Sequence, residues 1–356
     1  MDYGNGETTE SRPSARAGTA PNVDILSGIF RDCNQPYKFL FFHALLALSE
    51  RRPDRLLRFD ELLEEIMIMA WWPKMAARLT IGNLGANDTL SALLLQLGNA
   101  VEEKLPHEQV KALAKLHVRR ERRRGCLRYV PERLLTPWKN ASGPPLFSIV
   151  EEGVLLDPDW IAYCRLNMAI LKGWVDGAWL SWMQARNPNV PVTLQKLYQP
   201  SRRLSLARER SLIAGSLGRR PSFCIYTQQP VTPTDFSLDH FLPHSFVGHN
   251  RIWNLIPVSK SLNSKKRARI PKASFAEGLL SFHQEIVFDL LAAEGEPSLW
   301  LEQYCIDLRI SCSDLANAEI FKRAFLQNIL AQIEIAKRMG FPGNWEPETA
   351  RGRAVM

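Results

Sequence analysis

Cysteine is sparse in this 356-residue chain, and no two of its 6 cysteines stand in a C-x-x-C pair. That spacing excludes a zinc ribbon and gives no sign of a disulfide framework. Scattered single cysteines are typical of a reducing cytoplasm, where they act as small apolar residues. We therefore expect a cytoplasmic protein without a structural zinc.

Long hydrophobic runs are also missing. The two most apolar stretches, Phe39–Leu48 and Ile66–Trp72, are much shorter than the roughly 20 residues that a helix needs to cross a bilayer. The N-terminus is polar, so we expect no secretory signal. Both stretches are predicted to be buried helices, and no membrane partner is expected.

Positive charge exceeds negative charge, with a formal net charge of +8. This balance favours a polyanionic partner, with nucleic acid ahead of an anionic membrane. The basic residues are densest in Arg119–Arg124 and again in Arg202–Arg220. Each stretch is either a phosphate-contacting patch or a solvated helix face, and the sequence leaves both interpretations open.

Most of the chain shows helical spacing of its apolar residues. We predict helices over residues 37–49, 58–67, 90–97, 110–116 and 159–166, and a helical tail over residues 275–339. No internal repeat is visible. The expected organisation is a disordered tail (1–21), an N-terminal helical domain (22–145, ending in a Pro/Gly/Asn-rich junction), a helical linker region with a basic stretch (146–220), a module of different character (221–272), a C-terminal helical region (273–345) and a disordered tail (346–356).

The module of different character lies between Cys224 and Pro271 and has the pattern strand, loop, strand, helix. Its first strand-like run ends at Asp239-His240, and Asn254 opens the second. The helix that follows carries Asn263 and Lys266, which are three residues apart and therefore share a face.

These residue types suit phosphodiester hydrolysis, which needs a base to deprotonate water and a cation to neutralise charge at the phosphate. His240 is a suitable base because its unperturbed pKa is about 6.5. Asp239 and the amide oxygen of Asn263 are hard oxygen ligands, which suit one Mg²⁺, with Mn²⁺ as an alternative. Lys266 would lie on the same helix face, within reach of a phosphate.

The adjacent placement of Asp239 and His240 raises a geometric difficulty, because neighbours in a regular strand point to opposite faces. Both side chains can serve one site only if the backbone becomes irregular there. Pro243, just beyond them, favours such an irregularity.

The set Asp239-His240, Asn254 and Asn263 resembles the motif of the HNH (ββα-metal) nuclease family, with Asn in place of the final His. The spacing is especially similar to the HNH domain of the CRISPR RNA-guided DNA nucleases. The resemblance covers only the segment from Cys224 to Pro271.

The resemblance implies a role for each matching residue. His240 would be the general base, and Asp239 and Asn263 would be the metal ligands. Asn254 would brace the loop between the strands and so orient the histidine, and Lys266 would be a further catalytic residue. The candidate nucleic-acid contacts around this motif, which are equally typical of a solvated surface, are Lys265, Arg267, Arg269 and Arg251.

The sequence departs from many HNH proteins because Thr227 stands where a second zinc-binding cysteine would follow Cys224. We therefore expect packing by Tyr226, Phe236 and Trp253 to hold the loop instead. Two further histidines, His244 and His249, are assigned to loop structure or substrate contact.

The resulting hypothesis is a mainly α protein with an inserted ββα-metal (HNH) nuclease module, an α+β fold overall. Its expected function is Mg²⁺-dependent nicking or cleavage of DNA, with a weaker lean towards phage defence or restriction. The alternatives are a catalytically silent HNH fold used for nucleic-acid binding or assembly, and a nuclease or toxin that acts on RNA. The helical flanks could bind DNA, bind a protein partner or form a homodimer.

Overall fold

The computed structural model describes residues 21–52, 54–82, 89–97, 107–120, 125–198, 205–293 and 299–348. It is mainly helical, as predicted, with three small sheets among the described residues. Much of both predicted tails lies outside the described residues, as do Arg202, Arg203 and most of the Arg119–Arg124 run.

The chain divides into two compact units. Unit 1 comprises Met1–Ile68 and Pro106–Trp179, and unit 2 comprises Met69–Leu105 and Leu180–Met356. The helices α2 and α7 each begin in unit 1 and end in unit 2.

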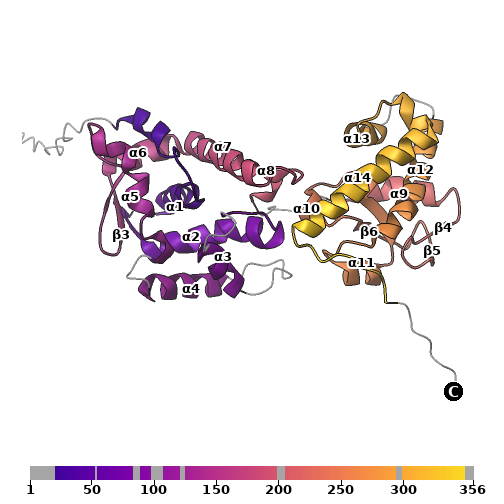
Figure 1. Ribbon diagram of the computed structural model, residues 1–356, viewed down its shortest axis with the longest axis horizontal. Coiled ribbons are helices and arrows are strands. Elements are labelled where there is room, and N and C mark those ends of the chain that lie inside the picture. Colours follow the sequence, from indigo (N-terminus) through magenta and orange to yellow (C-terminus); the bar gives the residue numbers. More distant parts are fainter. Residues whose placement is uncertain are drawn as a thin grey trace, which may run out of the picture. The chain divides into compact units, whose positions relative to one another are not determined.

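Unit 1 is built mainly from helices (Figure 1), and these helices bury apolar side chains. The helices predicted over residues 37–49, 58–67, 110–116 and 159–166 are confirmed as α1, α2, α4 and α6. The elements are η1 Val23–Gly28, α1 Tyr37–Arg51, β1 Leu56–Arg58, α2 Phe59–Trp71, α4 His107–Arg120, η3 Gly125–Leu127, α5 Val130–Leu134, η4 Thr136–Asn140, β2 Phe147–Ile149, β3 Gly153–Leu156, α6 Pro158–Leu166 and α7 Met168–Arg186.

A three-stranded antiparallel sheet in the order β1-β3-β2 was not predicted. Its strands are three or four residues long, too short for an alternating pattern to stand out from the helical spacing around them. Leu57 pairs with Val154, so the pairing joins segments on either side of the predicted junction at residues 137–145.

In unit 2, helices pack around a short hairpin formed by β6 and β7 (Figure 1). The helix predicted over residues 90–97 is confirmed as α3, and the predicted helical tail consists of three helices, α12 to α14. The elements are η2 Trp72–Ala76, α3 Thr89–Gln96, α8 Thr193–Lys196, α9 Ala207–Leu217, β4 Ser222–Phe223, β5 Pro230–Val231, β6 Ser237–His240, α10 His244–Val247, η5 Ile252–Asn254, β7 Leu255–Val258, α11 Lys260–Lys266, η6 Ala273–Phe275, α12 Ala276–Ala292, α13 Leu299–Leu308, η7 Ser313–Ala316 and α14 Ala318–Arg338.

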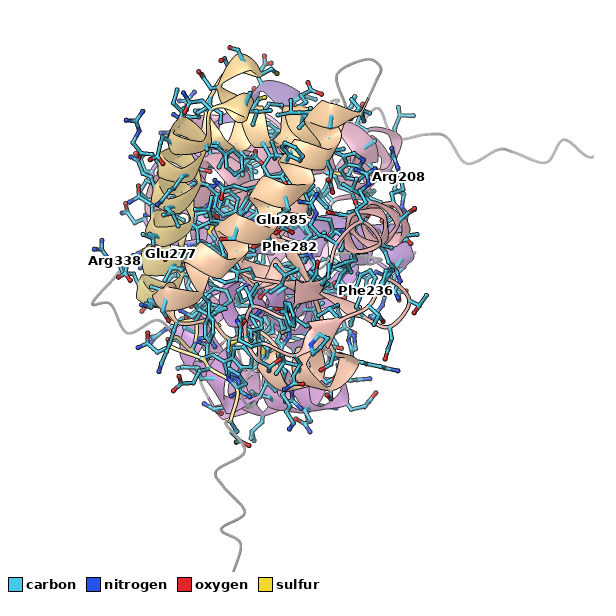
Figure 2. The ribbon with its side chains drawn as sticks, turned by 90° about the vertical axis from the view of Figure 1, so that its right-hand side faces the viewer. Arg208, Phe236, Glu277, Phe282, Glu285 and Arg338 are labelled. Carbon is cyan, nitrogen blue, oxygen red and sulfur yellow. The ribbon has the colours of Figure 1, made fainter. Side chains whose placement is uncertain are left out.

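One hydrophobic core joins the hairpin to these helices. Buried residues from α9, β6, β7, α12, α13 and α14 all belong to it. Figure 2 shows α12, marked by Glu277, Phe282 and Glu285, running beside α14. Tyr226, Phe236 and Trp253 are buried in this same core, as the packing hypothesis requires.

No helix in the described part of the chain combines the length and the apolar character that crossing a membrane requires.

The three-stranded sheet depends on the absence of a side chain at Gly153. A Cβ atom added at Gly153 would lie 2.0 Å from the carbonyl oxygen of Leu57. Because that neighbour is backbone, we expect Gly153→Ala to lower the free energy of unfolding by roughly 2–4 kcal/mol. Gly173→Ala, in α7, is the matched control: a Cβ there meets nothing within 4 Å, so it should stabilise the helix by up to about 1 kcal/mol. Urea unfolding of both variants checks this, and equal stabilities would contradict it.

Candidate active site

The hairpin β6–β7 carries the acidic residue and the histidine at its end. Asp239 pairs with Ile256 and His240 with Leu255, in regular antiparallel register. The irregular backbone that Pro243 favoured is not found at these two residues, because β6 and β7 pair regularly as far as His240. Their side chains therefore leave the strand on opposite faces. They could serve one site only because His240 is the last residue of β6, where the paired strand ends. Asp239 is 3% exposed, whereas His240 is only half-buried.

Asp239 is bonded from two directions. The Lys266 ammonium lies 3.0 Å from Oδ2 and 3.1 Å from Oδ1, and the Tyr226 hydroxyl donates to Oδ2 at 3.2 Å. Burial raises the pKa of Asp239, and Lys266 opposes that shift. Burial likewise lowers the pKa of Lys266, with Asp239 opposing. Each charge therefore depends on the other to exist in this dry position.

Lys266 does not point to solvent. It is 1% exposed, and its Nζ also donates to the carbonyl oxygen of His240 at 2.6 Å. We expected this side chain to reach a phosphate, but the structure encloses it. The cause is the buried carboxylate of Asp239, which draws the ammonium beneath the strand end.

Asn263 is held with its amide in one orientation. Its Nδ2 donates to Ser237 Oγ and to the carbonyl oxygen of Leu238, both at 2.9 Å. A carbonyl oxygen can only accept, so Nδ2 must face β6 and Oδ1 must face away from it. No described residue donates a hydrogen bond to Oδ1, which leaves this oxygen open to a ligand.

Asn254 connects the two ends of the hairpin loop. It is completely buried, and its side chain accepts from Leu242 N at 2.8 Å and donates to Leu242 O at 2.9 Å. Its carbonyl oxygen accepts from Phe241 N at 2.8 Å. These three bonds fix the chain directly after His240, the position that a bracing residue would need.

The His240 ring is oriented by Asn250, a residue that no sequence pattern singles out. Its Nε2 lies 2.9 Å from Asn250 Oδ1. With the amide oxygen of Asn250 facing the ring, Nε2 is the donor in this hydrogen bond. The His244 ring lies 5.2 Å away, centre to centre.

His249 belongs to the structure of the loop. Its Nδ1 accepts from Arg251 N at 3.2 Å. Burial, aided by the charge of Arg251, lowers the pKa of His249 to about 3. The ring is therefore neutral at physiological pH.

The helix α13 holds the segment between Asn250 and Asn254 through two hydrogen bonds. Gln303 accepts from Ile252 N at 2.9 Å, and Asp307 accepts from Trp253 Nε1 at 2.6 Å. These contacts come from residues about 50 positions away in the sequence, so the motif itself gave no signal for them.

Three of the four predicted nucleic-acid contacts, Lys265, Arg267 and Arg269, are exposed at the end of α11 and just beyond it. Arg269 also donates to the carbonyl oxygen of Lys265 at 2.7 Å. Arg251 is less exposed, and its Nε lies 3.4 Å from Asp307. The described arginines of the second basic stretch also have partners within unit 2. Arg210 donates to Phe236 O, and Arg219 and Arg220 pair with Asp289.

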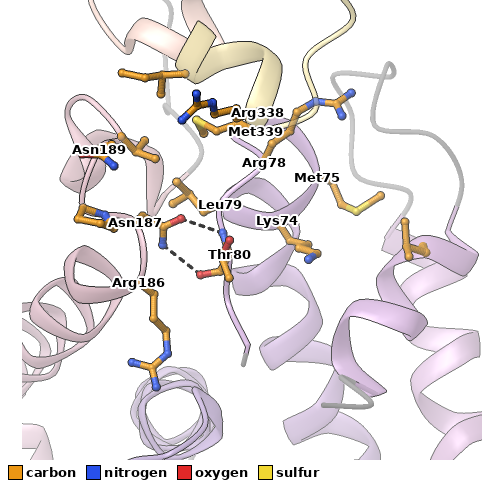
Figure 3. Close-up of a pocket in the computed structure, with 14 residues that line it drawn as sticks. Lys74, Met75, Arg78, Leu79, Thr80, Arg186, Asn187, Asn189, Arg338 and Met339 are labelled. Carbon is orange, nitrogen blue, oxygen red and sulfur yellow. Dashed lines mark hydrogen bonds between the residues drawn. The ribbon is translucent and has the colours of Figure 1, made fainter. Parts of the chain in front are cut away.

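A cavity of about 540 Å³ lies elsewhere in unit 2 and is bordered by several basic side chains. None of the predicted site residues lines it. Figure 3 shows the guanidinium groups of Arg186 and Arg338 pointing in different directions. The basic side chains around the cavity do not converge on one point, and we assign the cavity no ligand.

A family model described as HNH endonuclease matches residues 224–272. The chain contains an HNH endonuclease domain. The match spans β6, β7 and α11, and so covers all the predicted catalytic and metal-binding residues. Searches of curated proteins and of solved structures find no match.

The HNH family implies a divalent cation, and the donor set can be tested against it. No described group of three or more His, Cys, Asp or Glu residues could hold a metal ion. At the end of β6 the HNH domain offers the carboxylate of Asp239, whose oxygens also accept from Lys266 and Tyr226, and on α11 it offers the oriented amide oxygen of Asn263. Such a small oxygen set fits a cation that keeps several waters and takes substrate phosphate oxygens.

The buried ion pair gives the second prediction. Lys266→Met leaves the Asp239 carboxylate buried without its cation, so we expect a loss of roughly 3–5 kcal/mol in the free energy of unfolding. The matched control is Lys265→Met, at the exposed neighbouring position, which should change it by less than about 0.5 kcal/mol. Urea unfolding of the two variants measures the difference, and similar losses would show that the pair does not hold α11.

Proposed function

We propose that the HNH domain is a divalent-cation-dependent endonuclease that hydrolyses phosphodiester bonds in DNA. The observation that supports this most strongly is the attachment of α11 to β6. Asn263 bonds to Ser237 and Leu238, and Lys266 bonds to Asp239 and to the backbone of His240. One short helix thus holds the side chain of Asn263 beside the strand that carries both Asp239 and His240.

In this proposal His240 is the general base. The contact between Nε2 and Asn250 holds the imidazole at the end of β6, where the ring would take a proton from the attacking water. Asn254 is a positioning residue, because it fixes the loop that follows the histidine.

Asp239 and Asn263 would hold the cation, for which Mg²⁺ is the first choice and Mn²⁺ the alternative. When bound, the cation supplies positive charge against the phosphate oxygens. The Tyr226 hydroxyl holds one oxygen of Asp239 and so orients the carboxylate.

The substrate assignment rests on charge and on the family resemblance. The exposed residues Lys265, Arg267 and Arg269 provide a basic surface beside the site. This chemistry attacks phosphate without needing a 2′-hydroxyl, so RNA is the competing substrate. A single HNH site cuts one strand, and a double-strand break would need a second copy or a second encounter. A role in phage defence or restriction extends the proposal by resemblance alone.

A catalytically silent HNH fold is the competing function, and the third prediction separates the two. We expect His240→Ala to reduce nicking of supercoiled plasmid in Mg²⁺ or Mn²⁺ at least about 100-fold, because the base acts in the chemical step. DNA affinity should stay near wild type, since it comes from many basic contacts. His107→Ala, at an exposed position on α4, is the control and should nick normally.

Cation dependence is tested in the same assay. EDTA should abolish nicking, and Asp239→Ala or Asn263→Ala should weaken it strongly. Full activity in EDTA, or wild-type nicking by His240→Ala, would refute the proposed chemistry. A wild-type protein that binds DNA but never nicks it would support the silent fold, whereas cleavage of RNA alone would reassign the substrate.

The fourth prediction concerns the basic surface. Replacing Lys265, Arg267 and Arg269 by glutamine should weaken binding to all DNA sequences alike. The slope of log affinity against log salt concentration should fall by about one unit for each lost phosphate contact. Arg219→Gln together with Arg220→Gln, which are paired with Asp289, is the comparison variant and should change the slope less. Equal slopes for wild type and the triple variant would place the DNA path elsewhere.

A further inference from the structure

Two cysteines meet at the end of α13, although seven positions separate them in the sequence. The sulfur atoms of Cys305 and Cys312 lie 3.0 Å apart. Cys312 is exposed and Cys305 is partly exposed, so both can be reached from solvent. A disulfide bond is about 2.05 Å long, so the two sulfurs need to move only about 1 Å closer to form one.

The backbone holds both cysteines in place. Arg309 adopts a left-handed conformation, with φ at 55°, which ends α13, and Ile310 N donates back to Cys305 O at 3.2 Å. Beyond this reversal, the Ser311 hydroxyl donates to Asp314 Oδ2 at 2.6 Å, and Asp314 N donates to Ser311 Oγ at 3.2 Å. Cys312 lies inside this closed turn, and the loop that would be cross-linked is therefore already formed.

We propose that Cys305 and Cys312 are a reversible dithiol modification site that closes to an intramolecular disulfide on exposure to peroxide. This inference does not depend on the nuclease proposal. The pairing comes from the fold, because no C-x-x-C spacing signals it. In a reducing compartment such a pair is thiol by default and closes only under oxidation.

The chemistry proceeds in two balanced steps. The exposed Cys312 thiolate attacks one oxygen of hydrogen peroxide, the O–O bond breaks, and the products are a sulfenic acid and hydroxide. The Cys305 sulfur, giving up its proton, then attacks the Cys312 sulfur, and the S–O bond breaks with loss of water. Overall, two thiols and one peroxide give one disulfide and two waters. Burial raises the pKa of Cys305 to about 12, so Cys305 is the less reactive thiol towards peroxide, and the first attack is assigned to the exposed Cys312.

The cysteine pair is connected to the HNH domain through α13. Cys305 lies on α13 between Gln303 and Asp307, the two residues that grip Ile252 and Trp253. A disulfide would fasten the last turn of this helix to the start of η7. Opening of α13, and with it of the segment between Asn250 and Asn254, should become rarer in the oxidised protein.

The fifth prediction tests the pair directly on the full chain. After treatment with hydrogen peroxide and blocking of the remaining thiols, peptide mapping should show a Cys305–Cys312 cross-link, with the mass of two hydrogens lost, which dithiothreitol reverses. Cys312→Ser, at an exposed position, should remove the cross-link and leave the fold intact. Cys33→Ser is the matched control and should retain it.

Hydrogen exchange provides a second readout that does not depend on the variants. Amides of residues 299–312 and 251–254 should exchange more slowly in oxidised than in reduced wild type, and this difference should vanish in Cys312→Ser. Absence of the linked peptide, cross-linking of Cys312 to another chain on a non-reducing gel, or linkage of Cys305 to a different cysteine would each overturn the proposal.

Discussion

The buried ion pair between Asp239 and Lys266 is the constraint on which the arrangement of the HNH domain depends. The two side chains are 4% and 1% exposed, and neither charge could be kept in so dry a place alone. Because Lys266 also donates to the backbone of His240, the pair fixes the C-terminal end of α11 against the end of β6. The position of Asn263, one turn earlier on the same helix, follows from that attachment.

The same pair sets up a competition for one carboxylate. Asp239 neutralises the Lys266 ammonium inside the chain, and in the proposed function it would also bind a divalent cation. Both partners are positive, so each reduces the attraction of the carboxylate for the other. A residue that serves stability and function at once is a typical compromise at active sites. The oriented oxygen of Asn263, which has no described partner, is free of this conflict.

The order of elements in the HNH domain could be predicted from its sequence, whereas the directions of its side chains could not. The three-residue spacing of Asn263 and Lys266 predicted a shared helix face, and both side chains do bond to β6. That spacing does not distinguish a lysine facing solvent from one drawn under a strand by a buried carboxylate.

Contacts between segments that are distant in the sequence could not be predicted from local residue patterns. Asn250 orients His240 through a loop whose path depends on α13, which lies about 50 residues further along the chain. The strands β1 and β3 pair across almost 100 residues, and each is too short to show a clear alternation. The contact between Cys305 and Cys312 depends on the left-handed backbone conformation of Arg309. Arginine rarely adopts this conformation, so the sequence did not predict it.

The flanking helices stabilise the small HNH domain, which has no C-x-x-C cysteine pair. A segment of about 50 residues rarely buries enough apolar surface to be stable alone, and small domains usually add a metal or a disulfide. Here Ile270 N donates to Pro342 O at 2.8 Å, and the Tyr226 ring packs edge-on against Trp345 at 5.0 Å. The core of the hairpin continues into α9, α12 and α14. The C-terminal region therefore stabilises the hairpin from outside the matched segment, and the geometry around His240 depends on these distant residues.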